Sequence, residues 1–457
     1  MSRFQPTRRG FVAGCSAAIA GMAGTRFPSL AFADPEGTVN DEILVVVFLR
    51  GGMDGLNLVV PISGADRGYY EIERPNIAVP LSGTNSALSV DGTFGFHPAA
   101  QPIHQLYQSG KVAIVNATGL NEASRSHFDS MEFIERGTPG IKTTASGWLA
   151  RHFMSAHNLP PEIIMPSVSV GNLQATSLLG DTDTINMADP DSFNLQVGPW
   201  EWRNAQRVAL RHMYTGDNTW LHASGLQALD AMDIVELNTT GNYTPSNGAV
   251  YPSGSFGDGL QVIAQMTKLD LGLRVATMDL GGWDTHVSQG DAGGGYFAGL
   301  IETLSEGLAA LYTDLNGAGP NNYTQRLTMV VQSEFGRRFK ENADRGSDHG
   351  HGNPMIVISG NAVPGVHGAW PGLGPGQLFD DADLAVTTDF RRVLSEILIR
   401  RMGNNHLGFV FPGYSDYQPL GIVGGTDIPP DYSSTGDGLF SDDFESGGTG
   451  NWTVTTP

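Results

Sequence analysis

The stretch ILVVVFLRGGMDGLN, residues 43–57, decides the fold. Its first seven residues are apolar and mostly β-branched, which predicts a buried strand at 43–49. Glycines follow directly, and they let the backbone turn sharply and approach a ligand. Asp54 would then lie at the carboxyl end of the strand, where α/β sheets bind their ligands. A glycine turn with Asp54 in a purely structural hydrogen bond is the alternative.

Further runs of the same kind predict strands at residues 111–116, 272–280, 326–333 and 354–359. Apolar residues repeat every three or four positions over 297–311, which is typical of one face of a helix. Another helix is expected at 389–402, with Asp389 as its N-cap, and a third from Ser126. Strands that alternate with helices predict an α/β fold with a mostly parallel central sheet.

The charge of the chain excludes some classes of partner. Its 457 residues include 26 basic and 47 acidic side chains, for a net charge of -21. This excess of acid argues against nucleic acid and anionic lipid as partners. Solubility accounts for most of these charges, and clustered carboxylates that hold metal ions are compatible with them. The only cysteine is Cys15, inside the expected signal, so the mature chain offers no disulfide or thiol chemistry.

Both ends of the chain differ from its middle. Residues 1–33 resemble a twin-arginine export signal, with TRRGFV at 7–12, an uncharged apolar stretch and a small-x-small cleavage site before Asp34. That stretch is too short to span a bilayer, so we expect no stable membrane insertion and export to the periplasm or the medium. Residues 421–457 are rich in Gly, Ser, Thr and Asp and predict a flexible acidic tail. Residues 34–420 remain as one α/β domain.

Two polar clusters adjoin predicted elements and contain candidate site residues. The first, SRSHFD at 124–129, opens a helix. Its Ser126 suits an N-cap, but a nucleophilic oxygen would also gain from the positive helix end. In the second, Asp284 and His286 follow a strand and a Gly-Gly turn. Carboxylate oxygen and imidazole nitrogen in this position suit a metal ion.

The densest cluster surrounds the next two strands. Glu334 and Arg337 follow the strand that ends at 333, and SDHGHGN at 347–353 precedes the strand at 354–359. The second segment contains Asp348, His349 and His351, and glycine between them allows the backbone to wrap one ion. An ordinary surface loop is the alternative. The sequence has no cysteine zinc site, phosphate-loop lysine or dinucleotide glycine fingerprint.

The order of the motifs FLRGGMDGLN, SRSHFDS, GGWDTH, SEFGRR and DHGHGNP resembles the family catalogued as domain of unknown function 1501, over roughly residues 42–412. That family is grouped with the alkaline phosphatase and sulfatase superfamily. The resemblance therefore implies a three-layer α/β/α sandwich with a mixed, mostly parallel sheet, and two divalent metals at the strand ends. By position it implies a nucleophile at Ser126 and metal ligands at Asp54, Asp284, His286, Glu334 and His351, with Asp348 and His349 beside them.

Two departures from the superfamily pattern limit what the resemblance implies. The middle pair is spaced Asp-x-His instead of Asp-x-x-x-His, and Phe335 stands where the superfamily has a histidine. Asp348 or His349 replaces that histidine, or one metal site is absent. Activity therefore does not transfer with the fold.

We expect a secreted metal-dependent hydrolase of phosphate or sulfate esters that acts on a small anionic ester. Ser126 would attack, while zinc, manganese, iron or calcium would polarise the ester oxygens. Arg125 or Arg337 would clamp the anion. The alternative is a non-catalytic extracellular binding protein, which the missing histidine favours. A surface-assembly factor with an unidentified protein partner is a further alternative, suggested only by the tail.

Overall fold

The computed structural model describes residues 39–434 except 160–162, 164, 196–199, 218 and 240–242. The expected export signal and residues 435–457 lie outside the described residues. Within the described residues, no helix is both long enough and apolar enough to cross a membrane.

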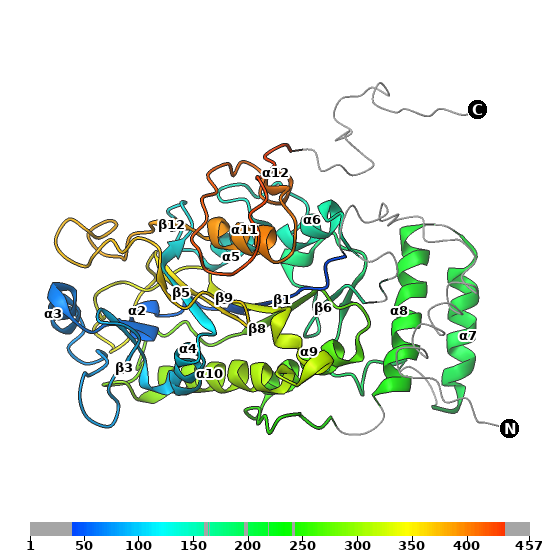
Figure 1. The fold of residues 1–457 in the computed structure, drawn as a ribbon, viewed down its shortest axis with the longest axis horizontal. Helices are drawn as coiled ribbons and strands as arrows, with labels where there is room; N and C mark the ends of the chain where they lie inside the picture. The colour runs from blue at the N-terminus through cyan, green and yellow to red at the C-terminus, as the bar shows by residue number, and fades with distance from the viewer. Residues whose placement is uncertain are drawn as a thin grey trace.

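The structure is built on a nine-stranded sheet in the order β11-β5-β10-β9-β1-β8-β6-β7, with β12 beside β5 (Figure 1). Its strands are β1 (Ile43–Leu49), β5 (Val112–Gly119), β6 (Ser167–Ser169), β7 (Thr184–Asn186), β8 (Val275–Leu280), β9 (Leu327–Ser333), β10 (Asn353–Ser359), β11 (Gly365–His367) and β12 (Thr388–Asp389).

The sheet is mixed and mostly parallel, as predicted. β1 pairs in parallel with both β8 and β9, whereas β10 pairs antiparallel with β9 and β5. All five expected strands are confirmed, with small shifts at their ends. β8 begins at Val275, and the predicted start at Gly272 has a left-handed φ of 92°, which a strand does not allow.

Helices cover both faces of the sheet, so the three-layer α/β/α architecture is confirmed (Figure 1). Successive residues of β1 alternate between the two cores: Val45 and Val47 belong to one, Val46 and Phe48 to the other. Each such buried side chain contributes about 1.5–3 kcal/mol. The first face is covered by α4 (Gln101–Gln108), α9 (Ser255–Leu269) and α10 (Gly295–Leu315), and the second by α5 (His127–Arg136), α6 (Trp148–Ser155), α11 (Phe390–Arg400) and α12 (Leu407–Val410).

The three predicted helices occur at α10, α11 and α5. Asp389 caps α11 by accepting a hydrogen bond from the Arg391 backbone N–H at 2.9 Å. Ser126 caps α5. Smaller elements complete the fold: α2 (Gly55–Leu58), β2 (Val59–Pro61), α3 (Gly64–Glu73), β3 (Leu88–Ser89) and β4 (Phe94–Phe96), and a hairpin of α7 (Arg203–Tyr214) and α8 (Trp220–Asn238) at one side of the molecule (Figure 1).

The folded part of the chain continues past residue 420, where we expected the tail to begin. Ile422 and Val423 are fully buried in the core beneath α11. The buried Glu396 carboxylate accepts hydrogen bonds from the backbone N–H groups of residues 420–423 and holds this segment in place. These contacts assign at least Ile422 and Val423 to the domain.

The sheet topology brings the polar clusters to one edge. β1, β5, β8 and β9 point the same way, so the segments that follow them lie at their shared carboxyl edge. β10 runs in the opposite direction, so the segment that precedes it lies at that edge as well. The candidate site is built from these five segments.

Candidate metal centre

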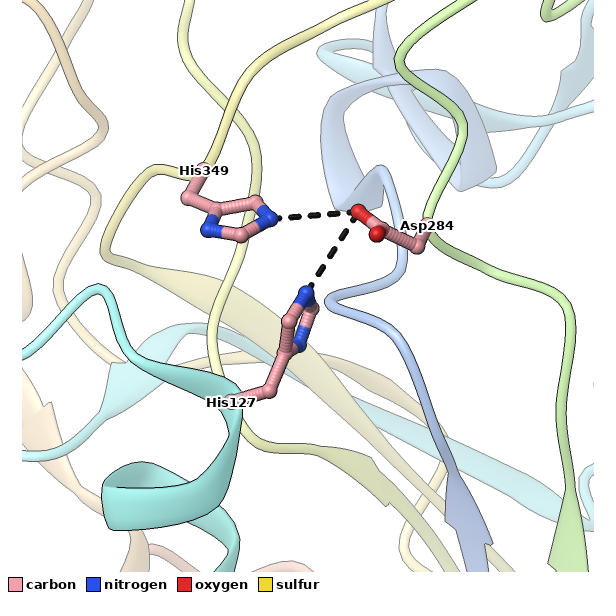
Figure 2. Close-up of side chains that lie close together, drawn as sticks. All are labelled: His127, Asp284 and His349. Carbon is pink, nitrogen blue, oxygen red and sulfur yellow. Dashed lines mark hydrogen bonds and ion pairs between the residues drawn. The ribbon is translucent and has the colours of Figure 1, made fainter.

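Four side-chain atoms converge beyond the carboxyl edge of the sheet. Asp284 Oδ1 lies 3.0 Å from His286 Nε2, 3.1 Å from His349 Nε2 and 3.4 Å from His127 Nε2. His286 Nε2 and His349 Nε2 are themselves 3.0 Å apart. Figure 2 shows His127, at the start of α5, and His349, in the segment before β10, both pointing at Asp284.

Each of the three imidazoles uses its other nitrogen to bind an acceptor. His127 Nδ1 lies 2.7 Å from Glu334 Oε1, and His286 Nδ1 lies 3.0 Å from Asp348 Oδ1. His349 Nδ1 lies 2.9 Å from the carbonyl oxygen of Arg125. Carboxylate and carbonyl oxygens only accept, so each Nδ1 carries the hydrogen, and the Nε2 of a neutral ring carries a lone pair.

The Nε2 atoms of His127, His286 and His349 therefore all lie beside Asp284 Oδ1, and the ligand atoms of His127, Asp284 and His349 lie within 4.8 Å of one another. Burial lowers the pKa of His349, which keeps this ring neutral. A hydrogen bond with Glu334 raises the pKa of His127 instead. His127 Nε2 is buried and has no hydrogen-bond partner although it faces the Asp284 carboxylate. Where these rings are neutral, their Nε2 lone pairs repel the carboxylate oxygen, and a bound cation relieves that repulsion.

The residues present fit a transition-metal ion. Ligand bonds of about 2.0–2.2 Å place neighbouring ligand atoms about 3–3.5 Å apart, and Asp284 Oδ1 lies 3.0–3.4 Å from the three Nε2 atoms. A histidine that binds a metal ion usually donates its other N–H to a carboxylate or a carbonyl, as these three do. Three imidazoles and one carboxylate suit zinc, manganese or iron, whereas calcium prefers a shell of oxygens. Within the described ranges this is one centre, where the resemblance implied two.

Asp284 is held ionised by a buried arginine. Arg337 Nη2 donates to Asp284 Oδ1 at 2.5 Å. Partial burial by itself would raise the pKa of Asp284, but this bond and its charge lower the pKa to about 2. The other donors of Arg337 bind backbone carbonyls of Gly51, Gly52 and Ser347 at 2.5–2.8 Å.

These contacts correct the role that the sequence suggested for Arg337. Its side chain is 0% exposed and its guanidinium nitrogens are already engaged, so it is not free to clamp an anion. It ties the segment after β1 to the segments that carry Asp284 and His349. The reason is general: a buried guanidinium must satisfy its donors locally.

Glu334 and Asp348, which we predicted as ligands, lie one step further from the point of convergence. Glu334 is fully buried and accepts from His127 Nδ1, from the Gly51 backbone N–H at 2.8 Å and from Ser333 Oγ at 2.9 Å. Burial would raise the pKa of Glu334, but the hydrogen bonds from His127 and from backbone N–H groups lower it. A hydrogen bond from Asn342 lowers the pKa of Asp348, which binds His286. Both carboxylates orient imidazoles of the cluster.

Asp54 is not brought to this cluster. Its Oδ2 forms a fully buried ion pair with Arg74 at 2.7 Å and accepts from Gln289 Nε2 at 2.6 Å. A buried carboxylate requires such a partner, and Arg74 supplies the charge that a metal would otherwise provide.

His351 also lies apart from the four converging atoms. Its ring stacks on Phe379 with centroids 4.2 Å apart, and burial lowers its pKa to about 4.

Ser126 and Arg125 have structural partners. Ser126 Oγ accepts from the Asp129 backbone N–H at 3.4 Å, as its alternative role of helix cap requires. The Arg125 guanidinium binds Asp383 at 2.5 Å and Asp380 at 3.0 Å. The nucleophilic role of Ser126 stays a prediction.

His127 was not predicted as a site residue. It stands within the SRSHFDS motif, one residue after Ser126, and α5 contributes its ring to the cluster. The signal that could have found it was a histidine at the first position of a helix that follows a predicted strand.

A family model described as "Protein of unknown function (DUF1501)" matches residues 223–406. This segment contains Asp284, His286, Glu334 and His349, and it confirms the resemblance over that part of the chain. The motifs that carry Asp54 and His127 precede it. No curated protein matches the chain.

Solved structures of low identity are similar to this chain. Ps i-CgsB in complex with k-i-k-neocarrahexaose is 12% identical, with 78% of this chain and 71% of that chain covered and a TM-score of 0.34. A protein in the alkaline phosphatase superfamily from Vibrio parahaemolyticus is 8% identical, with 72% of this chain and 63% of that chain covered and a TM-score of 0.30. Alkaline phosphatase from the Antarctic bacterium TAB5 is 12% identical, with 72% of this chain and 95% of that chain covered and a TM-score of 0.27.

Proposed function

We propose that this chain, whose residues 223–406 match the DUF1501 family, is an exported metal-dependent hydrolase of phosphate or sulfate esters. Its metal centre would consist of Asp284, His286, His349 and His127. The observation that carries the proposal is the convergence of three Nε2 atoms on one carboxylate oxygen, while every Nδ1 is bound to an acceptor behind it.

The exposure of the centre supports a catalytic rather than a purely structural metal. The side chains of Asp284 and His286 are 47% and 39% exposed. Structural metal sites are closed by their ligands, whereas catalytic sites keep a position open to substrate. An ester could therefore reach the centre from solvent.

Each residue of the centre has a distinct task in this proposal. A bound divalent ion supplies Lewis-acid chemistry, which polarises an ester oxygen and lowers the pKa of an attacking hydroxyl or water. Asp284 and the histidines bind the ion. Glu334 and Asp348 keep Nδ1 protonated on His127 and His286, so that Nε2 stays available.

The metal and the activity are tested together on protein purified after native export. We expect bound zinc, manganese or iron by elemental analysis, and turnover of a generic aryl phosphate or aryl sulfate. Asp284→Asn should lose both metal and turnover. Asp380→Asn is the matched control, because Asp380 is an exposed carboxylate paired with Arg125. Full metal content and full activity in Asp284→Asn would refute the proposal.

The role of Ser126 needs its own test. As a helix cap only, Ser126→Ala should cost about 1 kcal/mol of stability, Ser126→Asp should restore it, and turnover should change little. As a nucleophile, both variants should lose nearly all turnover and keep their metal.

A non-catalytic binding protein is the second candidate. It is favoured by the engagement of Arg125 and Arg337 with acidic and backbone partners, which leaves neither side chain free to clamp an ester anion. If metal-loaded wild-type protein hydrolyses neither class of ester, this second candidate replaces the hydrolase.

Export is the part of the proposal that rests on the sequence alone. Lysine in place of both Arg8 and Arg9 should leave the precursor in the cytoplasm, because the receptor of the pathway tolerates lysine poorly. Normal export of that double variant would contradict the twin-arginine assignment.

A further inference from the structure

A buried glutamine outside the ligand set, Gln289, joins the segments that carry the centre. Its side chain is almost completely buried. Gln289 Nε2 donates to Asp54 Oδ2 at 2.6 Å. Gln289 Oε1 accepts from Thr285 Oγ1 at 2.8 Å and from Ser347 Oγ at 3.0 Å. One amide group therefore binds three segments that are far apart in the sequence.

The partners of Gln289 are placed next to the ligands. Thr285 stands between Asp284 and His286, and Ser347 stands two residues before His349. These two segments also bind each other directly, since the Ser347 backbone N–H donates to the Thr285 carbonyl at 3.1 Å. Any movement of the amide would therefore be transmitted to three of the four converging side chains.

The orientation of the amide is determined by its partners. The Asp54 carboxylate only accepts, so the NH₂ group of Gln289 must face it, and the carbonyl oxygen then faces the two hydroxyl donors. Asp54 is itself held by the buried ion pair with Arg74. The backbone of Gln289 is also fixed, because its N–H donates to Arg345 O at 2.9 Å and its carbonyl accepts from Phe297 N at 2.8 Å.

We propose that Gln289 is a positioning residue of the metal centre. Through Thr285 and Ser347 it sets the spacing of Asp284, His286 and His349, and it links them to the fixed carboxylate of Asp54. This inference rests on the proposed metal centre and adds no ligand to it. Residues that hydrogen-bond a metal ligand directly change metal affinity by about 10–100-fold when they are replaced, and Gln289 acts one contact further out, through Thr285 and Ser347.

The test measures metal binding, independently of ester turnover. Purified metal-free protein is titrated with Co²⁺, which gives both an affinity and a visible spectrum that reports ligand geometry. Gln289→Met preserves the size of the side chain and removes the amide, and we expect an altered spectrum and up to about 10-fold weaker binding, the lower end of the range for direct partners of a ligand. Gln174→Met is the matched control, because the Gln174 amide donates to the backbone carbonyls of Leu178 and Asp181.

A double-mutant cycle separates positioning from a general loss of structure. Thr285→Val removes one hydroxyl that donates to the amide, and alone it should weaken Co²⁺ binding by a smaller factor. Combined with Gln289→Met it should add little, because both changes remove the same interaction. If Gln289→Met does not fold, Thr285→Val together with Ser347→Ala provides the same comparison.

The outcomes distinguish this inference from the proposed function. Wild-type affinity and spectrum in Gln289→Met would overturn the inference and leave the hydrolase proposal standing. Weakened Co²⁺ binding in Gln289→Met, with no ester turned over by the wild type, would support the inference and overturn the hydrolase. A wild-type protein that binds no Co²⁺ would overturn both.

Discussion

Replacement of Glu334 by glutamine tests whether His127 is a metal ligand. Glu334 is fully buried, and its bond to His127 is the largest cause that raises the pKa of that imidazole. Glutamine has nearly the same shape. Its carbonyl oxygen can still accept from His127 Nδ1 and Gly51 N, while its NH₂ group can face Ser333 Oγ. The change therefore removes the negative charge and keeps the hydrogen bond.

The magnitude follows from the role of that charge. A carboxylate behind a ligating histidine makes its Nε2 more basic, and its loss costs about 10–100-fold in metal affinity, or about 1.4–2.7 kcal/mol. The sign of the pH effect is also determined. Protons compete with the metal below the pKa of His127, so the lower pKa in Glu334→Gln should move the acid loss of binding to a lower pH.

The assay is Zn²⁺ or Co²⁺ titration of Glu334→Gln and wild type at pH 8 and at several lower values. Glu341→Gln is the control, because Glu341 is a buried carboxylate that accepts from the backbone N–H groups of Asn76 and Ile77. It should lose stability and keep metal affinity. Equal affinity of Glu334→Gln and wild type at pH 8, with the same pH dependence, would show that His127 does not bind the metal.

Three further predictions concern stability. Burial lowers the pKa of His152 to about 4, so this histidine takes up a proton at a higher pH in the unfolded state than in the folded state. The free energy of unfolding should therefore fall by about 3 kcal/mol from pH 6.5 to pH 4. In urea unfolding, His152→Gln should not show this fall. Glu396→Gln should cost about 2 kcal/mol and expose residues 421–434 to limited proteolysis, because the carboxylate accepts from their backbone. Zn²⁺ at a hundredfold excess over its Kd should stabilise the wild type by about 2.7 kcal/mol in the same urea experiment, and His349→Ala should abolish this gain.

Much of the fold could be predicted because its determinants are local. The apolar run of β1 and the caps at Asp389 and Ser126 are readable in a few adjacent residues. The edge of the sheet that carries the site was also predictable, since polar clusters follow the strands. The boundary near 421 was not, because Glu396 holds that segment from a distant helix.

The sequence by itself determined the alternation of strands and helices, the edge that bears the polar clusters and the pairing of Asp284 with His286. Only the tertiary structure decided which polar groups face one another. Asp54 and Asp284 both follow strands, yet Arg74 neutralises the first while three imidazoles surround the second. A carboxylate's role depends on the groups that packing brings within a few ångströms, and apart from His286 those come from residues 20 to more than 150 positions away in the chain.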